Sequence, residues 1–166
     1  MTQTDCLTAA MLTVGQTYVA RLRFTREQVA AYCALVGDAN GIHRDLEAAR
    51  RRFPGATDIV VPGGLIQSTL SGVFGTRFPG DGSLGLTFVP ERLRKPVLPG
   101  EEVVATFEIV RLKGAIVEFE VTVADAQGAR LTTAKAKVLA PDETYRAWWE
   151  RSRAAESHGT LKHAQR

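Results

Sequence analysis

Apolar and polar residues alternate along most of the second half of the chain, over residues 101–139. Alternation with a period of two puts successive side chains on opposite faces of a strand, so that one face can be buried. Turn residues at Lys113-Gly114 and at 125–128 interrupt the alternation, which predicts three long antiparallel strands joined as a meander. A shorter alternating run at 16–24 predicts a first strand, and 84–89 is predicted as another strand.

Three segments carry the signals of surface helices. The first is predicted at Thr25–Val36, where the first residue and Gln28 match a capping box and Gly37 suits the C-terminal cap. A short helix is predicted over 46–52, with its arginines on one side. A last helix is predicted from Pro141 to about Ala155, and its two tryptophans are expected to dock on the body of the protein or on a second subunit.

The segment 65–74 differs from these helices because it is apolar nearly all round and carries no charge. A helix of this kind should be buried on most sides. It therefore predicts a central helix wrapped by a curved sheet, which is an α+β architecture. Gly63 and Gly64 precede this helix, where backbone N–H groups are unpaired and small residues let a ligand approach. The same glycines can also serve only to let the helix start close beneath the sheet.

The length of 166 residues and the composition fit one globular domain. We expect a loose N-terminal segment over 1–14, a single domain over 15–140, and a C-terminal helix with a flexible tail over 141–166, in which His158 and His163 are tail residues. No apolar run approaches the roughly 20 residues that span a bilayer, and the first residues lack the order of a signal peptide. These features favour a soluble, cytoplasmic protein with no membrane partner.

Cysteine content and charge exclude several classes of site. Cys6 and Cys33 provide neither a disulfide framework nor a metal-ligand cluster, so we expect reduced thiols and no metal site. The net charge is +3, and part of the excess lies in Arg50-Arg51-Arg52. Only Phe53 adjoins this run, whereas a nucleic-acid surface needs interleaved stacking aromatics. A solvated helix face is favoured for the run, and the phosphates of a coenzyme A are a better candidate ligand than nucleic acid.

Candidate chemistry lies where the first predicted helix ends, in the sequence Gly37-Asp38-Ala39-Asn40-Gly41-Ile42-His43. Asn40-Gly41 is a turn signal, so the chain should fold back and bring Asp38 near His43. A carboxylate and a neutral imidazole that share a water can move protons in both directions, as addition or removal of water requires. The residues alone also allow a simpler interpretation, in which Asp38 caps a turn and His43 is a satisfied surface residue.

Three motifs together resemble those of the MaoC-like, (R)-specific enoyl-CoA hydratases. The first motif, Asp38-x-Asn40-x-x-His43, is similar to the acid and histidine motif of that family. The segment 59–68 is similar to the family's segment before the central helix, and the segment 93–101 is similar to its Pro-Val-x-x-Gly-acidic segment. Order and spacing agree over roughly residues 15–140. The chain departs from the family at Gly41, where proline is usual, and at Pro62, where histidine is usual. Neither departure removes the acid or the base.

The resemblance implies a hot-dog fold, in which a curved antiparallel sheet wraps a central buried helix, and reversible addition of water to a trans-2-enoyl thioester. It implies that His43 takes a proton from water as the oxygen attacks C3, and that Asp38 holds this water and supplies the proton that ends at C2. Because strongly interacting groups titrate as a pair, the sequence does not fix which group carries which proton.

The resemblance implies roles for four further residues. Asn40 would orient the water or the acid, although as a turn residue it needs no catalytic role. Gly63 or Gly64 would donate to the thioester oxygen as negative charge develops on it. Ser68 would hydrogen-bond to Asp38, or would serve only as a small residue that eases helix packing.

The resemblance also implies that the substrate carries coenzyme A or the phosphopantetheine of an acyl carrier protein, that no metal or organic cofactor takes part, and that the protein is a homodimer whose sheets continue edge to edge. Two alternatives remain open. A hot-dog thioesterase would use an acidic residue near the central helix, and residues 64–76 contain none. A non-catalytic acyl-thioester-binding subunit would explain the departures at Gly41 and Pro62.

Overall fold

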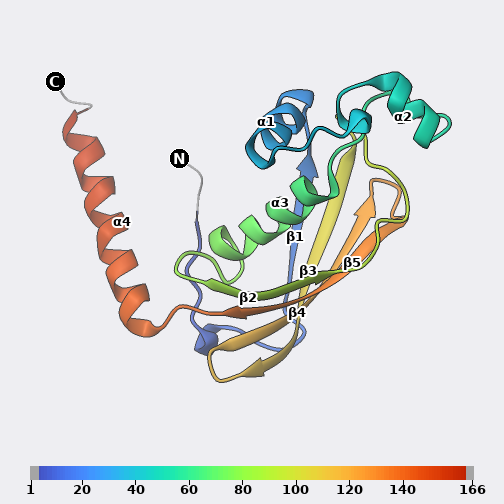
Figure 1. The fold of residues 1–166 in the computed structure, drawn as a ribbon. Coiled ribbons are helices and arrows are strands. Elements are labelled where there is room, and N and C mark those ends of the chain that lie inside the picture. Colours follow the sequence, from blue (N-terminus) through green and yellow to red (C-terminus); the bar gives the residue numbers. More distant parts are fainter. Residues whose placement is uncertain (1–3, 164–166) are drawn as a thin grey trace.

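The computed structural model describes residues 4–163, and the side chains of residues 4–155. A five-stranded antiparallel sheet forms the body, with the strands in the order β1-β3-β4-β5-β2 (Figure 1). In chain order the elements are η1 (Ala9–Met11), β1 (Thr17–Arg23), α1 (Arg26–Val36), η2 (Gly41–His43), α2 (Leu46–Arg52), α3 (Gly63–Thr76), β2 (Leu84–Pro90), β3 (Glu102–Lys113), β4 (Ile116–Asp125), β5 (Arg130–Leu139) and α4 (Glu143–His163).

The five predicted strands are confirmed, and the alternation over residues 101–139 appears as alternating burial in β3, β4 and β5. Every second residue in the first part of β3 is buried, from Val103 to Ile109. On the opposite face, β4 and β5 place opposite charges across from one another, Glu118 beside Lys137 and Glu120 beside Lys135. Such cross-strand pairs stabilise a sheet by roughly 0.2–1 kcal/mol each. One face of the sheet is therefore available for the core and the other for water.

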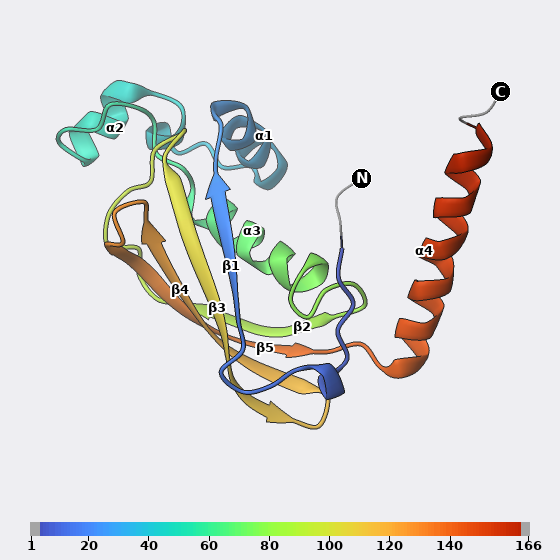
Figure 2. The same ribbon diagram turned by 180° about the vertical axis from the view of Figure 1, so that it is seen from behind.

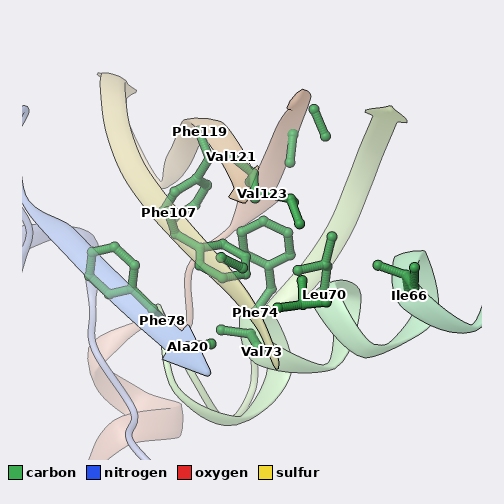
Figure 3. Packing of buried hydrophobic residues seen from close by; sticks show 14 of the residues in the cluster. Ala20, Ile66, Leu70, Val73, Phe74, Phe78, Phe107, Phe119, Val121 and Val123 are labelled. Carbon is green, nitrogen blue, oxygen red and sulfur yellow. The ribbon is translucent and has the colours of Figure 1, made fainter. Parts of the chain in front are cut away.

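Helix α3 crosses the concave face of the curved sheet (Figures 1 and 2). Its buried side chains point into the cluster shown in Figure 3: Ile66, Leu70, Val73 and Phe74. The ring of Phe74 meets that of Phe107 edge to face at a centroid distance of 5.2 Å and lies 5.0 Å from that of Phe119. Each such aromatic contact contributes about 0.5–1.5 kcal/mol beyond burial. This cluster fixes α3 on the sheet, as the hot-dog fold requires.

The expectation that residues 65–74 are buried on most sides is wrong in one respect. The face of α3 that points away from the sheet is exposed and carries only small residues: Ser68, Ser71, Gly72 and Gly75. The sheet covers only the opposite side of the helix, so this face stays open in the single chain. Small uncharged residues suit a buried face and a closely approached surface equally well, which is why the sequence did not distinguish them.

The N-terminal segment is not loose as far as the structure describes it, from Thr4 onward; residues 1–3 lie outside the described residues. Cys6 forms an isolated antiparallel bridge with Gly80, and Leu12 is 4% exposed in the main core. The Thr8 hydroxyl donates to Glu143 at 2.6 Å. These contacts join segments far apart in the chain, and no local pattern of residues 1–14 indicates them.

Helix α4 extends to His163, beyond its predicted end near Ala155, and stands off the sheet at the end opposite α1 and α2 (Figures 1 and 2). The prediction about His158 and His163 concerns side chains that lie outside the described residues. None of the helices in the described part of the chain is both long and apolar enough to cross a membrane.

The start of α4 is held on the body by polar contacts. The Tyr145 hydroxyl donates to Asp81 at 2.9 Å. Trp149 is partly buried, and the Arg153 guanidinium lies 5.2 Å from its ring centre. Trp148 is 52% exposed. One of the two tryptophans therefore packs against the described chain, and the other faces outward.

Candidate active site

Helix α1 ends at the turn that carries the predicted acid and base. The predicted capping box is present: Gln28 N–H donates to the Thr25 hydroxyl, and Thr25 N–H donates to the Gln28 side chain. Gly37 closes the helix in the left-handed conformation, with φ 71°, which glycine adopts without strain. The N–H of Asp38 donates to the Cys33 carbonyl at 2.9 Å. These bonds fix the direction in which Asp38 leaves the helix.

Asp38 is oriented by the turn that follows it. Its Oδ1 accepts the Asn40 N–H at 2.8 Å, and Arg44 donates to its backbone carbonyl at 2.7 Å. The side chain is 29% exposed. Burial raises the pKa of the Cys33 thiol, and the negative charge of Asp38 raises this pKa further, against the opposing effect of Arg44. Only the Oδ1 oxygen of Asp38 is thus bonded within the turn, and the negative charge of the carboxylate reaches Cys33 near the end of α1.

His43 is the last residue of η2, and its side chain is only 9% exposed. Its Nδ1 lies 2.6 Å from the carbonyl oxygen of Val60. A carbonyl oxygen only accepts hydrogen bonds, so the neutral ring carries its proton on Nδ1. The other nitrogen, Nε2, then has a free lone pair. The Val60 contact therefore makes Nε2 the basic atom of His43.

The structure brings Asp38 and His43 together, as the turn signal predicted. Nε2 of His43 lies 3.7 Å from Oδ2 of Asp38. This separation exceeds the roughly 2.7–3.2 Å of a direct hydrogen bond, and a water about 2.8 Å from both atoms fits it. The His43 side chain is 9% exposed and its Nδ1 contacts the Val60 carbonyl, so it is not a freely exposed surface residue.

Helix α3 begins at Gly63, directly after the buried Pro62. The N–H groups of Leu65 and Ile66 both donate to the Pro62 carbonyl, at 3.0 and 3.3 Å. Those of Gly63 and Gly64 donate to no residue that the structure describes. The first N–H groups of a helix carry the positive end of its dipole. The glycines thus offer two backbone donors to a ligand at the start of α3.

Val60 ties the acid–base turn to this helix start. Its N–H donates to the Ile42 carbonyl at 2.9 Å, while its own carbonyl accepts the His43 ring. Gly63 follows three positions later, and three residues span at most about 10 Å. Val60, which contacts the base, and the glycine donors therefore lie on one short segment of the chain.

The structure does not place Asn40 and Ser68 in the predicted side-chain roles. The Asn40 side chain accepts the Ile42 N–H at 3.4 Å and caps η2, while its backbone N–H is the group that contacts Asp38. Ser68 lies on the exposed face of α3, one turn beyond Gly64. No hydrogen bond joins Ser68 to Asp38 among the described residues. Their simpler interpretations, as a turn residue and a small helix residue, agree with this geometry.

The two departures from the family pattern fit locally. A Cβ added at Gly41 would lie 3.3 Å from the Ala48 Cβ, so glycine lets η2 pack closely on α2. Pro62 has φ −56°, within the range that its ring fixes. Neither residue displaces Asp38 or His43, which leaves both groups available for chemistry.

The arginine run and the two cysteines do not form a second candidate site among the described residues. Arg51 pairs with Glu47 on the exposed face of α2, in keeping with a solvated helix face. Cys6 and Cys33 are buried free thiols. Within residues 4–155, no group of three His, Cys, Asp or Glu side chains is placed to hold a metal ion.

One residue near the site was missed by sequence reasoning. A Cβ added at Gly64 would lie 2.2 Å from the hydroxyl oxygen of Tyr32, on α1. The hydroxyl therefore sits over the start of α3. Tyr32 lies less than two helical turns before Asp38, but only the contact between α1 and α3 reveals its position.

No protein-family model matches the chain. It is 36% identical over 112 residues to an (R)-specific enoyl-CoA hydratase of Aeromonas caviae, a match that covers 64% of this chain and 78% of the hydratase. It is 30% identical over 105 residues to the mitochondrial 3-hydroxyacyl-[acyl-carrier-protein] dehydratase FERN of Solanum lycopersicum, covering 62% of this chain. The match spans only 59% of the length of that tomato protein.

Solved structures show the same fold. An (R)-hydratase from A. caviae superposes with a TM-score of 0.73 at 32% identity, covering 80% of this chain and 100% of the hydratase. A MaoC-like dehydratase from Rhodospirillum rubrum shares the fold with a TM-score of 0.67 at 21% identity, over 82% of this chain and 98% of the dehydratase. By its identity to the A. caviae hydratase and its shared hot-dog fold, the chain belongs to the family of (R)-specific enoyl-CoA hydratases and MaoC-like dehydratases.

Proposed function

We propose that this protein is an (R)-specific enoyl-thioester hydratase, a hydro-lyase that adds water reversibly to a trans-2-enoyl thioester. The observation that carries the proposal is the contact of His43 Nδ1 with the Val60 carbonyl, which leaves Nε2 as a base 3.7 Å from Asp38 Oδ2. A base and a carboxyl group that share one water provide the proton transfers of hydration. The A. caviae relative, named as an (R)-specific enoyl-CoA hydratase, supports the same reaction.

The reaction uses this pair twice. Water held between Asp38 Oδ2 and His43 Nε2 attacks C3 of the enoyl group, and Nε2 takes its proton as the C3–O bond forms. The electron pair of the C2=C3 bond moves through C1 onto the thioester oxygen. C2 then takes a proton from the Asp38–His43 pair, which returns to its starting state. Hydrogen and hydroxyl are added from the face of the substrate that the pair occupies.

The start of α3 stabilises the charge that develops on the thioester oxygen. In this proposal the N–H groups of Gly63 and Gly64 donate to that oxygen, aided by the positive end of the helix dipole. Loss of one such donor typically lowers kcat by about 10²–10³-fold. Backbone donors are fixed before the reaction begins, so no reorganisation is needed as the charge forms.

The proposed reaction needs neither a metal nor an organic cofactor, because the conjugated thioester itself accepts the electron pair. The carrier of the acyl group is coenzyme A or the phosphopantetheine of an acyl carrier protein. The A. caviae relative is named for the first and the tomato relative for the second. Both carriers present the same thioester to the site.

We infer that two copies of the chain pair through β2. This strand lies at one edge of the sheet and exposes three apolar side chains, Leu84 at 60%, Leu86 at 48% and Val89 at 63%. Unpaired edges with apolar residues favour association with another strand. A second sheet that continues from β2 would make a homodimer.

Crotonyl-CoA tests the reaction directly. Addition of the purified protein should remove the ultraviolet absorbance of the enoyl thioester, and chiral analysis should identify (R)-3-hydroxybutyryl-CoA. Free thiol measured in parallel distinguishes hydrolysis: thiol without hydration would replace the proposal with a thioesterase. If short and long enoyl thioesters of coenzyme A and of acyl carrier protein all remain unchanged and no thiol is released, the result favours a non-catalytic acyl-thioester-binding subunit.

A further inference from the structure

Tyr32 of α1 places its hydroxyl directly over Gly64, at the start of α3. A Cβ built on Gly64 would lie 2.2 Å from the hydroxyl oxygen and 3.1 Å from the ring carbon that bears it. With one carbon–carbon bond of about 1.5 Å, the oxygen lies within about 3.7 Å of the Gly64 Cα. Only glycine leaves room for this contact. The contact of Tyr32 with Gly64 therefore fixes how closely the hydroxyl approaches the start of α3.

The direction of the contact places the hydroxyl beside the free backbone donors. Cα–Cβ bonds in a helix tilt toward its N-terminus. An atom that occupies the Cβ direction of Gly64 therefore lies on the side toward which the N–H groups of Gly63 and Gly64 point. The Tyr32 hydroxyl and the two backbone donors therefore all lie at the start of α3.

The Tyr32 hydroxyl is available to a ligand. The side chain is partly buried, and its oxygen takes part in no hydrogen bond with the residues that the structure describes. Partly enclosed tyrosine hydroxyls usually find a partner. A hydroxyl can donate one bond and still rotate to suit its acceptor. These properties suit a donor to a substrate oxygen.

An open cavity of about 340 Å³ lies beside the hydroxyl, between β1, α1 and α3. Tyr32 lines it together with five apolar residues, among them Leu35 on α1 and Leu65 on α3, and with three polar ones: Arg23, Gln28 and Thr69. A cavity with an apolar lining and a few polar groups is typical of a ligand site. A thioester whose oxygen meets the hydroxyl can extend one of its apolar arms into this space.

We propose that Tyr32 is a further catalytic residue, whose hydroxyl donates a hydrogen bond to the thioester oxygen beside the N–H groups of Gly63 and Gly64. This inference rests on the proposed hydratase function. The hydroxyl forms and breaks no covalent bond. It strengthens its hydrogen bond as the oxygen becomes negative, so its contribution is larger in the transition state than with the bound substrate.

The test compares Tyr32→Phe with the wild-type protein, and uses Tyr145→Phe as a control that removes a hydroxyl from α4. Butyryl-CoA, which has the thioester oxygen, and S-butyl-CoA, which lacks it, measure the contact without turnover. Tyr32→Phe should bind butyryl-CoA about 3–10-fold more weakly and S-butyl-CoA unchanged. Hydration of crotonyl-CoA should fall about 10–100-fold in kcat, with a smaller change in KM. Tyr145→Phe should alter neither measurement.

Three results would overturn the inference: wild-type behaviour of Tyr32→Phe with both ligands, equal weakening with both, or a wild-type protein that binds neither ligand. Equal weakening would indicate a structural role for the ring. Failure of the proposed function has a different signature, because a wild-type protein that cannot hydrate crotonyl-CoA still reports on Tyr32 through the two binding measurements.

Discussion

Replacing Gly64 with alanine tests the contact between α1 and α3 by the stability of the protein. The new Cβ would lie 2.2 Å from the Tyr32 hydroxyl oxygen, so the Tyr32 side chain or one of the two helices has to move. Overpacking of this kind costs about 1–3 kcal/mol, while alanine in a helix gains about 0.5–1 kcal/mol over glycine. The variant should be destabilised by about 0.5–2 kcal/mol, which lowers Tm by about 2–6 °C in a domain of this size.

The sign of the effect should depend on Tyr32. In the Tyr32→Phe background the nearest side-chain atom to the new Cβ is a ring carbon at 3.1 Å, which requires a shift of only a few tenths of an ångström. Gly64→Ala should then lie within about 0.5 kcal/mol of neutral, because the gain in helix propensity offsets the remaining crowding. Urea denaturation of the four proteins gives the coupling energy, expected at about 1–2 kcal/mol. Gly72→Ala is the matched control, since its Cβ would meet nothing within 4 Å. Equal destabilisation in both backgrounds would refute the placement of Tyr32.

Three further predictions concern the base, the sheet edge and pH. His43→Ala should abolish hydration and lower the free energy of unfolding, measured in urea, by about 1–3 kcal/mol, because it leaves the buried Val60 carbonyl unpaired. His43→Asn should lose the same activity but keep an N–H for that carbonyl. Equal stability of the two variants would contradict the assigned tautomer. Leu86→Lys should convert the dimer into a monomer in gel filtration, and an unchanged dimer would exclude pairing through β2. The hydrogen bond to Asp81, with burial second, raises the pKa of the Tyr145 hydroxyl. The folded protein holds this proton more tightly than the unfolded chain, so the associated stability is present below about pH 10 and is lost as pH rises through the folded value. Tm of Tyr145→Phe should therefore fall less than that of the wild type above pH 10, and parallel curves would contradict the linkage.

The elements with local signals could be predicted from the sequence. The capping box at Thr25 and Gln28, the left-handed Gly37 and the alternating strands each depend on residues within a few positions of one another. The contacts of the N-terminal segment could not be predicted, because Cys6 pairs with Gly80, a residue far away in the sequence that comes close only in the folded chain. The exposed face of α3 was also missed, since the small residues of that helix give no signal that separates a buried side from an open one.

The site was predictable to the same extent. The Asn40-Gly41 turn signal predicted the proximity of Asp38 and His43, which is confirmed at 3.7 Å. The burial of His43 and its bond to Val60 depend on a loop that returns from residues 53–60, and the sequence pattern does not show where that loop packs. The assignment of Nε2 as the base therefore needed the structure.

The central claim is that Asp38 and His43 act as one unit on a shared water. The most direct measurement is kcat/KM for crotonyl-CoA hydration by the wild type, by Asp38→Asn, by His43→Asn and by the double variant. Each single variant should lose at least about 10²-fold, and the double variant should be little worse than the poorer single one, because residues that act together are not additive. Retained activity in either single variant, or losses that multiply in the double variant, would contradict the account.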